Sequence, residues 1–245
     1  MIKAPVIRII HHSLVDGPGN RTSVFLQGCN LRCEYCHNPE TQEIVRYSEN
    51  LALPPDSEIK WMSPGEVFQE IKTDIPFIRG ITVSGGECML YPDFIKDLFT
   101  LCQEAGLSCL IDTNGTVDMT LYPDLMEVAT GVMLDIKAWD NYKFKLITGG
   151  SNETVKKNLK FLSDKDKLEE VRIVCIPNQV DAEAILSGIK DTIGNKINRF
   201  NLKLIRFRNH GVTGKFKDTD SPSDDYMDNL EVKATEMGFT VIKTI

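Results

Sequence analysis

The chain has 245 residues, of which 42% are apolar and 26% charged. That length suits one domain with a full hydrophobic core, and the composition excludes a disordered, collagen-like or disulfide-stapled protein. With 28 Lys and Arg against 35 Asp and Glu, the net charge is −7, so no basic excess points to nucleic acid or an anionic membrane. No apolar run approaches the roughly 20 residues that span a bilayer, and the N-terminus lacks the apolar core of a signal peptide, so we expect a cytoplasmic protein.

Short apolar runs alternate with helical patterns along the chain, which is typical of βαβ units and a parallel sheet. The runs are nearly continuous in hydrophobicity, as expected for strands buried on both faces. Six such units are too few for a complete eight-stranded barrel but suit an α/β fold with a partial (β/α)6 TIM-like barrel. A doubly wound open sheet is the alternative that the same pattern allows. The expected strands are 22–26, 81–84, 107–111, 132–136, 171–176 and 201–205.

Between these runs, apolar residues recur at helical spacing. Ser63-Pro64-Gly65-Glu66 offers an N-cap, a first-turn proline and a capping-box glutamate for one of these helices. Residues 41–62 form the least regular segment, with a Pro54-Pro55 pair, and indicate a surface excursion. Because no repeat or linker interrupts the pattern, we expect a single domain over residues 1–245.

Polar residues gather at the ends of three expected strands. Ser84-Gly85-Gly86-Glu87 follows one strand, Asp112-Thr113-Asn114-Gly115 the next, and Asp135-Ile136-Lys137 the third. The carboxyl ends of parallel strands carry the chemistry in such folds, so we expect these side chains to meet on one face. This is the strongest pointer to a site that the residues alone provide.

Three of the seven cysteines, Cys29, Cys33 and Cys36, follow the first expected strand within eight residues. In a reducing compartment such a cluster indicates metal binding or catalysis and not a disulfide framework. Thiolates select zinc, copper(I) or iron–sulfur clusters, and a zinc site could take His37 as its fourth ligand. Three thiolates without a fourth suit a four-iron cluster with one open iron. The dispersed Cys102, Cys109 and Cys175 are expected in the core.

The stretch Cys29-Asn30-Leu31-Arg32-Cys33-Glu34-Tyr35-Cys36-His37-Asn38 resembles the CxxxCxxC motif of radical S-adenosylmethionine (SAM) enzymes. The resemblance extends to glycyl-radical-enzyme activating enzymes of the pyruvate formate-lyase activase type. It is carried by Asp16-Gly17-Pro18-Gly19-Asn20-Arg21 before the cysteine motif and by the three strand-end motifs after it. Many relatives insert a ferredoxin-like segment with further cysteines after the first motif. Residues 41–62 contain no cysteine, so we expect no such insert and one cluster.

The resemblance implies a radical SAM core and an anaerobic oxidoreductase. A [4Fe–4S] cluster on Cys29, Cys33 and Cys36 would reductively cleave SAM, and the 5′-deoxyadenosyl radical would take a hydrogen atom from a glycine of a partner glycyl radical enzyme. A reduced flavodoxin or ferredoxin-type protein would donate the electron. Two alternatives stay open: a radical SAM enzyme acting on a small molecule, and a zinc-stabilised or electron-carrying α/β module without enzymatic activity.

The resemblance also implies roles for individual residues. For some of these residues a purely structural role is the alternative to a functional one. The structural roles are a tight turn for Gly85-Gly86, a buried ion pair for Asp135 and Lys137, and a solvated loop position for His210. A monovalent cation, Na⁺ or K⁺, would bind at Asp112, Thr113, Met133 and Asp135, since hard oxygen ligands suit it. The turn with Asp16, Gly17 and Gly19 would meet the partner's glycine loop. SAM would contact Tyr35, Cys36, His37, Gly85, Gly86, Glu87, Asp135, Ile136, Lys137 and His210.

Overall fold

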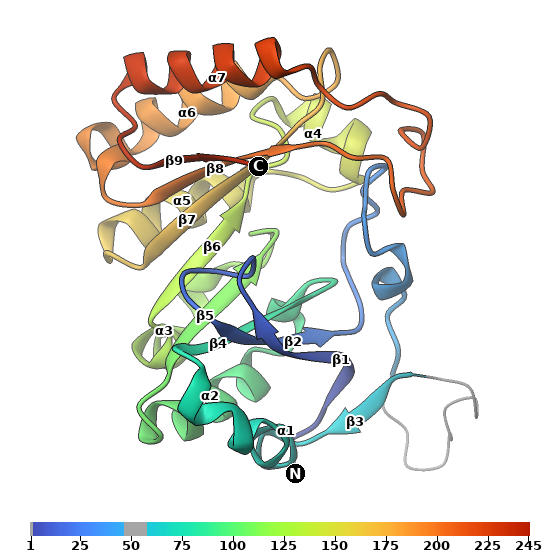
Figure 1. Ribbon diagram of the computed structural model, residues 1–245, viewed down its shortest axis with the longest axis vertical. Coiled ribbons are helices and arrows are strands. Elements are labelled where there is room, and N and C mark those ends of the chain that lie inside the picture. The colour runs from blue at the N-terminus through green and yellow to red at the C-terminus, as the bar shows by residue number, and fades with distance from the viewer. Residues whose placement is uncertain (1, 47–57) are drawn as a thin grey trace. The chain divides into compact units, whose positions relative to one another are not determined.

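The computed structural model describes residues 2–46 and 58–245, which divide into two compact units (Figure 1). Unit 1 comprises Met1–Asn30, Glu40–Thr113 and Leu121–Gly131, and unit 2 comprises Leu31–Pro39, Asn114–Thr120 and Val132–Ile245. The cysteine motif therefore begins in unit 1, with Cys29, and continues in unit 2.

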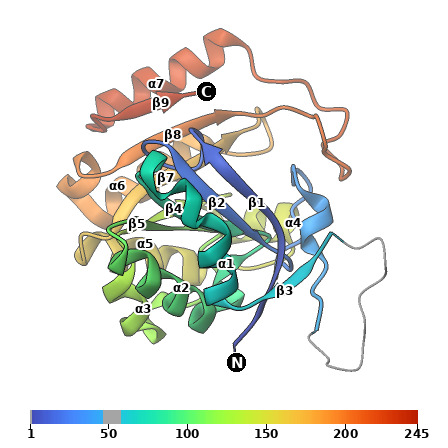
Figure 2. The same cartoon turned by 60° about the horizontal axis from the view of Figure 1, so that its bottom comes forward.

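Unit 1 is built on a mixed sheet in the order β3-β1-β2-β4-β5. The strands β2, β4 and β5 run parallel, whereas β1 is antiparallel to both β2 and β3. Every residue of β2 is buried. Helices α1, α2 and α3 pack side by side, with α2 against β4 and β5 (Figure 2). The bounds are β1 (Ala4–Ser13), β2 (Arg21–Leu26), β3 (Lys60–Met62), β4 (Gly80–Gly85), β5 (Ser108–Thr113), α1 (Pro64–Ile71), α2 (Pro92–Glu104) and α3 (Pro123–Val128).

Unit 2 contains four parallel strands in the order β6-β7-β8-β9. Helices α5 and α6 pack on β7, and α7 packs on β8, on β9 and beside α6 (Figure 1). The bounds are β6 (Gly131–Asp135), β7 (Leu168–Cys175), β8 (Asn201–Arg206), β9 (Ile242–Thr244), α4 (Asn141–Thr148), α5 (Glu153–Asp164), α6 (Ala182–Ile193) and α7 (Asp224–Met237). Short 3-10 helices are η1 (Pro39–Gln42), η2 (Lys72–Phe77), η3 (Cys88–Leu90), η4 (Met119–Leu121) and η5 (Gly194–Asn198).

The six expected strands are confirmed as β2 and β4 to β8. Their apolar runs are continuous because both faces of each strand are covered. The sequence pattern missed β1, β3 and β9. In β1, buried and exposed positions mix and His11 and His12 interrupt the apolar run, so no buried-strand signal arises. The capping box is confirmed: the Ser63 hydroxyl accepts the Glu66 N–H, and the Glu66 carboxylate accepts the Ser63 N–H at 2.7 Å.

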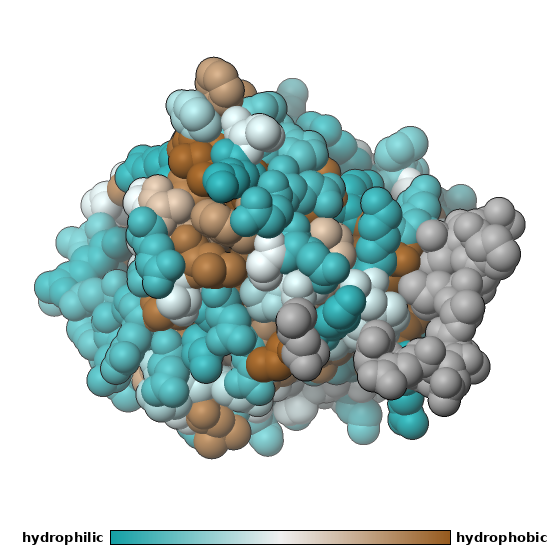
Figure 3. Space-filling model, turned by 90° about the horizontal axis from the view of Figure 1, so that it is seen from below, coloured by the Kyte–Doolittle hydropathy of each residue, from teal (hydrophilic) through white to brown (hydrophobic). Residues whose placement is uncertain are grey.

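The expected excursion over 41–62 falls partly on residues 47–57, which lie outside the described residues; its described ends include β3 and part of η1. Of the helices that the structure describes, none is long and apolar enough to cross a membrane. One face of the molecule is largely hydrophilic with scattered apolar side chains (Figure 3). The single domain over 1–245 stays a prediction.

Candidate active site

The turn before β2 carries the residues that the resemblance assigns to the partner. The carboxylate of Asp16 accepts hydrogen bonds from the hydroxyls of Ser13 and Ser23, both at 2.7 Å. Gly17 and Gly19 have φ angles of +119° and +80°, which residues with side chains rarely adopt. Local contacts therefore hold this turn in one conformation. Its contact with a partner stays a prediction.

The glycine turn after β4 packs directly on the backbone that leads into the cysteine motif. The Gly86 N–H donates to the Leu26 carbonyl at 3.0 Å, and the Glu87 N–H donates to the Gly28 carbonyl at 2.8 Å. A Cβ atom on Gly85 would lie 2.1 Å from the Leu26 oxygen, and one on Gly86 would lie 2.2 Å from the Gly28 oxygen. Chain packing alone therefore requires both glycines, and their contact with SAM stays a prediction.

Glu87 is nearly inaccessible, with 1% of its surface exposed. Its carboxylate accepts hydrogen bonds from the Thr113 hydroxyl at 2.7 Å and the Met89 N–H at 2.9 Å. At the same strand ends, Asp112 accepts a hydrogen bond of 3.0 Å from Ser84. Of the three strand ends that we expect to meet on one face, those of β4 and β5 are thus linked by hydrogen bonds within unit 1.

None of the three cysteines of the motif forms a disulfide within the residues that the structure describes. Cys29 is buried, and its N–H donates to the Gln42 carbonyl at 3.1 Å. Cys33 and Cys36 are half-buried, and the Cys36 N–H donates to the Cys33 carbonyl at 3.2 Å. In the described part of the chain, no three His, Cys, Asp or Glu side chains are grouped closely enough to hold a metal ion. Ligation by the three thiols therefore rests on the motif. As expected, Cys102, Cys109 and Cys175 are buried in the core.

Tyr35 and His37, on either side of Cys36, both belong to unit 2. The Tyr35 hydroxyl is buried and has no hydrogen-bond partner among the described residues. Burial raises the pKa of this phenol well above its usual range, although the charge of Lys137 acts in the opposite direction. The His37 Nε2 lies 2.7 Å from the Arg208 carbonyl oxygen, so this nitrogen carries the proton and donates it.

Asp135 and Lys137 lie at the end of β6 and just beyond it. The Lys137 Nζ donates to the Asp135 carboxylate at 3.0 Å and lies 5.8 Å from the centre of the Tyr35 ring. Burial by itself would lower the pKa of Lys137, but the Asp135 carboxylate, together with Tyr35 and Cys33, outweighs burial and raises that pKa well above its ordinary value. The ion pair of the structural alternative is thus present and partly buried, and the contact of both residues with SAM stays a prediction. Ile136 is buried beside it.

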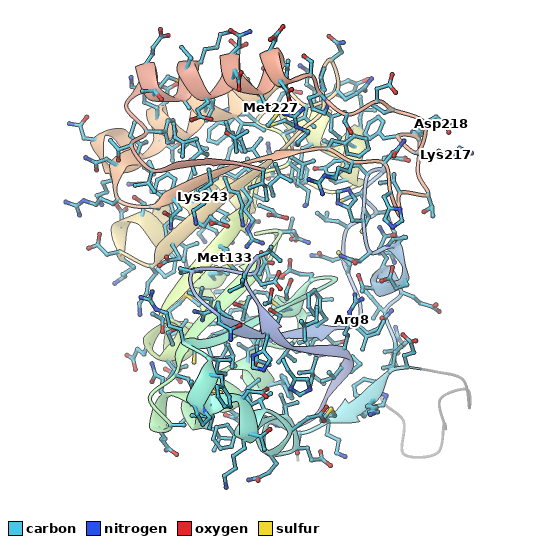
Figure 4. The ribbon with its side chains drawn as sticks, viewed as in Figure 1. Arg8, Met133, Lys217, Asp218, Met227 and Lys243 are labelled. Carbon is cyan, nitrogen blue, oxygen red and sulfur yellow. The ribbon has the colours of Figure 1, made fainter. Side chains whose placement is uncertain are left out.

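Met133, labelled in Figure 4, is fully buried on β6. Its sulfur accepts a hydrogen bond of 3.1 Å from the Arg172 guanidinium. His210 is exposed after β8 and lines a pocket of about 330 Å³. In that pocket, the Arg206 guanidinium is already bound to the Pro222 carbonyl at 2.7 Å and to Asp224 at 2.6 Å. The pocket lining consists of His37, Ile205, Arg206, Arg208, His210 and Ile245.

One structurally important residue had no role assigned from the sequence. Arg21 is 1% exposed, and its guanidinium donates to the carbonyls of Ile81 at 2.6 Å and Pro18 at 3.4 Å and to the Thr82 hydroxyl at 2.9 Å. It ties the Asp16–Gly19 turn to β4. An arginine at the start of a strand expected to be buried on both faces is the signal that could have found it.

Comparison with known proteins adds independent evidence. The model of the Radical SAM superfamily matches residues 23–186. The chain is 35% identical to the pyruvate formate-lyase-activating enzyme of Streptococcus mutans over 83% of this chain and 76% of that protein. It is 31% identical to the pyruvate formate-lyase-activating enzyme of Clostridium pasteurianum over 86% of this chain and 85% of that protein.

A solved structure is similar in fold to this chain. Streptococcus suis SuiB bound to precursor peptide SuiA has a TM-score of 0.62 and 15% identity, covering 89% of this chain and 47% of that one. At this identity the likeness shows the fold alone, and together with the family match it confirms the predicted α/β radical SAM fold. Family membership implies a [4Fe–4S] cluster, SAM and a glycyl radical enzyme as partner. The chain belongs to the radical SAM superfamily and, within it, to the glycyl-radical-enzyme activating enzymes.

Proposed function

We propose that this protein activates a pyruvate formate-lyase-like glycyl radical enzyme, and that Cys29, Cys33 and Cys36 hold its [4Fe–4S] cluster. The supporting observation is a CxxxCxxC motif, with its three cysteines outside any disulfide of the described residues, in a chain that matches the radical SAM family. The donor set fits the cluster because thiolates are the usual ligands of iron–sulfur clusters. When bound, cluster and SAM together supply a 5′-deoxyadenosyl radical, which removes a hydrogen atom from one glycine of the partner.

The chain's own residues would bind and orient SAM. The buried Tyr35 hydroxyl lacks a hydrogen-bond partner among the described residues, as expected for a polar atom next to a ligand site. The cation of Lys137 would attract the carboxylate of SAM, and the Asp135 carboxylate would accept from ribose hydroxyls. The other expected contacts are Cys36, His37, Gly85, Gly86, Glu87, Ile136 and His210.

A monovalent cation, Na⁺ or K⁺, would bind next to SAM through Asp112, Thr113, Met133 and Asp135. The carboxylate and hydroxyl oxygens of this set are hard ligands, which such a cation prefers. Asp112 and Thr113 are adjacent at the end of β5, and Met133 and Asp135 share one face of β6. Titration with Na⁺ and K⁺ during SAM binding tests this assignment.

The partner's glycine loop would meet the turn with Asp16, Gly17 and Gly19. Buried Arg21 and the two serines that bind Asp16 hold this turn in place, so it offers a preformed surface. A reduced flavodoxin or ferredoxin-type protein would supply the electron. This protein and its electron donor would both be located in the cytoplasm.

The decisive experiment is low-temperature electron paramagnetic resonance (EPR) on the anaerobically reconstituted, reduced protein with and without SAM. We expect a reduced four-iron signal that changes when SAM is added. A colourless protein with stoichiometric zinc would overturn the proposal. Mixing the reconstituted enzyme with SAM and a glycine-loop peptide should then yield a glycyl radical signal. Formation of 5′-deoxyadenosine with a small molecule, but never with a glycine-loop peptide, would support the small-molecule alternative.

A further inference from the structure

The segment of residues 207–216, which follows β8, packs along the loop of residues 33–37 that carries two of the cysteines. Both belong to unit 2. The Glu34 carboxylate accepts the backbone N–H of Lys215 at 3.0 Å and lies 3.3 Å from the Lys215 ammonium. The Tyr35 ring stacks on Phe216, with centroids 6.2 Å apart. Two successive residues of the loop are thus held by two successive residues of the segment.

The other end of the cysteine loop is held in the same way. The His37 ring stacks on Phe207, with centroids 6.0 Å apart and an interplanar angle of 27°. Its Nε2 donates to the Arg208 carbonyl at 2.7 Å. Because Tyr35 and His37 flank Cys36, contacts with the segment restrain that cysteine from both sides.

Glycines allow the two backbones to approach this closely. A Cβ atom on Gly214 would lie 2.2 Å from the Glu34 carbonyl oxygen and 2.8 Å from the Glu34 Cα. A Cβ atom on Gly211 would lie 3.0 Å from the His37 oxygen. Lys217 and Asp218, which directly follow the segment, are exposed to solvent (Figure 4). The contacts with the cysteine loop therefore come from residues 207–216.

We propose that residues 207–216 are a positioning clamp that fixes the backbone of the cysteine loop before the cluster arrives. This inference rests on the proposed function, in which Cys33 and Cys36 are cluster ligands. Outer contacts that fix the direction of metal ligands tune the affinity and the potential of the metal site. Apart from His210, for which a contact with SAM is proposed, the clamp residues would act only through the loop.

The clamp also links the cluster loop to the pocket after β8. Arg208 and His210 belong to the clamp and line the pocket of about 330 Å³ together with His37 of the loop.

The first test measures hydrogen exchange on the full chain before cluster reconstitution. The Glu34 N–H donates to the Ile147 carbonyl at 2.9 Å and reports on loop order. In Gly214→Ala, where the methyl group meets the Glu34 backbone, we expect this amide to exchange about tenfold faster than in the parent. Gly65→Ala is the matched control, because a Cβ atom there has nothing within 4 Å. Equal protection in parent and Gly214→Ala would overturn the clamp.

The second test uses the reconstituted protein. Glu34→Ala should lower the resistance of the cluster to a chelator about tenfold and shift its EPR signal and midpoint potential. Glu34→Gln keeps an acceptor for the Lys215 N–H and should restore most of the parent behaviour. An unchanged signal, potential and chelator resistance in Glu34→Ala would contradict the proposal. If the parent itself takes up no iron, the proposed function fails, while the exchange experiment still tests the clamp.

Discussion

The hydroxyl of Thr113 donates a hydrogen bond of 2.7 Å to the carboxylate of Glu87, and the donor and acceptor residues are both buried. This contact joins the ends of β4 and β5 in unit 1. It also shows that Glu87 has a structural role, because the same carboxylate caps η3 through the Met89 N–H. The Glu87 side chain is therefore already oriented before any cofactor contacts it.

Replacing Glu87 by Ala should therefore lower the free energy of unfolding by about 2 kcal/mol, because two buried donors lose this acceptor. Urea denaturation of the apo protein measures the change. Glu87→Gln keeps an oxygen for the Met89 N–H and should cost less. A loss below about 0.5 kcal/mol for Glu87→Ala, the usual range for surface substitutions, would refute the structural role.

Gly86→Ala should destabilise the protein through backbone contact. The added methyl group would lie 2.2 Å from the Gly28 oxygen and 2.6 Å from the Thr41 oxygen, and backbone atoms cannot move aside as a side chain can. We expect a loss of about 3 kcal/mol in unfolding free energy. Gly65→Ala, with open space around the new methyl group, should stay within about 0.5 kcal/mol of the parent. Equal stability of the two variants would contradict the packing argument.

Lys137→Met should cost about 2 kcal/mol of stability at neutral pH, since Asp135 is left without its buried partner but stays partly solvated. The pH dependence follows from the raised pKa of Lys137. The contribution of the pair is fully present below the lysine pKa of the unfolded chain, about 10.4, and is lost as the pH rises through the folded-state value. Thermal melts of parent and variant from pH 8 to pH 12 should therefore converge only in the alkaline range. A constant difference across that range would be inconsistent with this pair.

Cys33→Ala and Cys36→Ala should abolish cluster binding and SAM cleavage and leave the fold intact, because both thiols lie in a loop. Iron content after reconstitution and formation of 5′-deoxyadenosine measure the loss. Cys102→Ala is the matched control: this thiol is buried in α2, and its removal should cost only packing, about 1 kcal/mol. Normal 5′-deoxyadenosine formation in either loop variant would overturn the ligand assignment.

The sequence by itself determined the elements with strong local signals. Continuous apolar runs predicted β2 and β4 to β8, and Ser63 and Glu66 predicted the start of α1. The motifs also identified the family, because cysteine spacing and glycine turns are read along the chain. Mixed burial hid β1, and β3 and β9 span only three residues each, too short for a periodic pattern.

Only the tertiary structure decided how the site residues are held. Nothing near Glu34 in the sequence indicates Lys215, and nothing near Arg21 indicates that its guanidinium contacts Ile81. Such contacts depend on which distant segments the fold brings together, whereas sequence patterns report only the periodicity of one segment. Tertiary packing likewise gave Gly85 and Gly86 a structural reason that the motif could not supply, since the atoms they must avoid belong to another part of the chain.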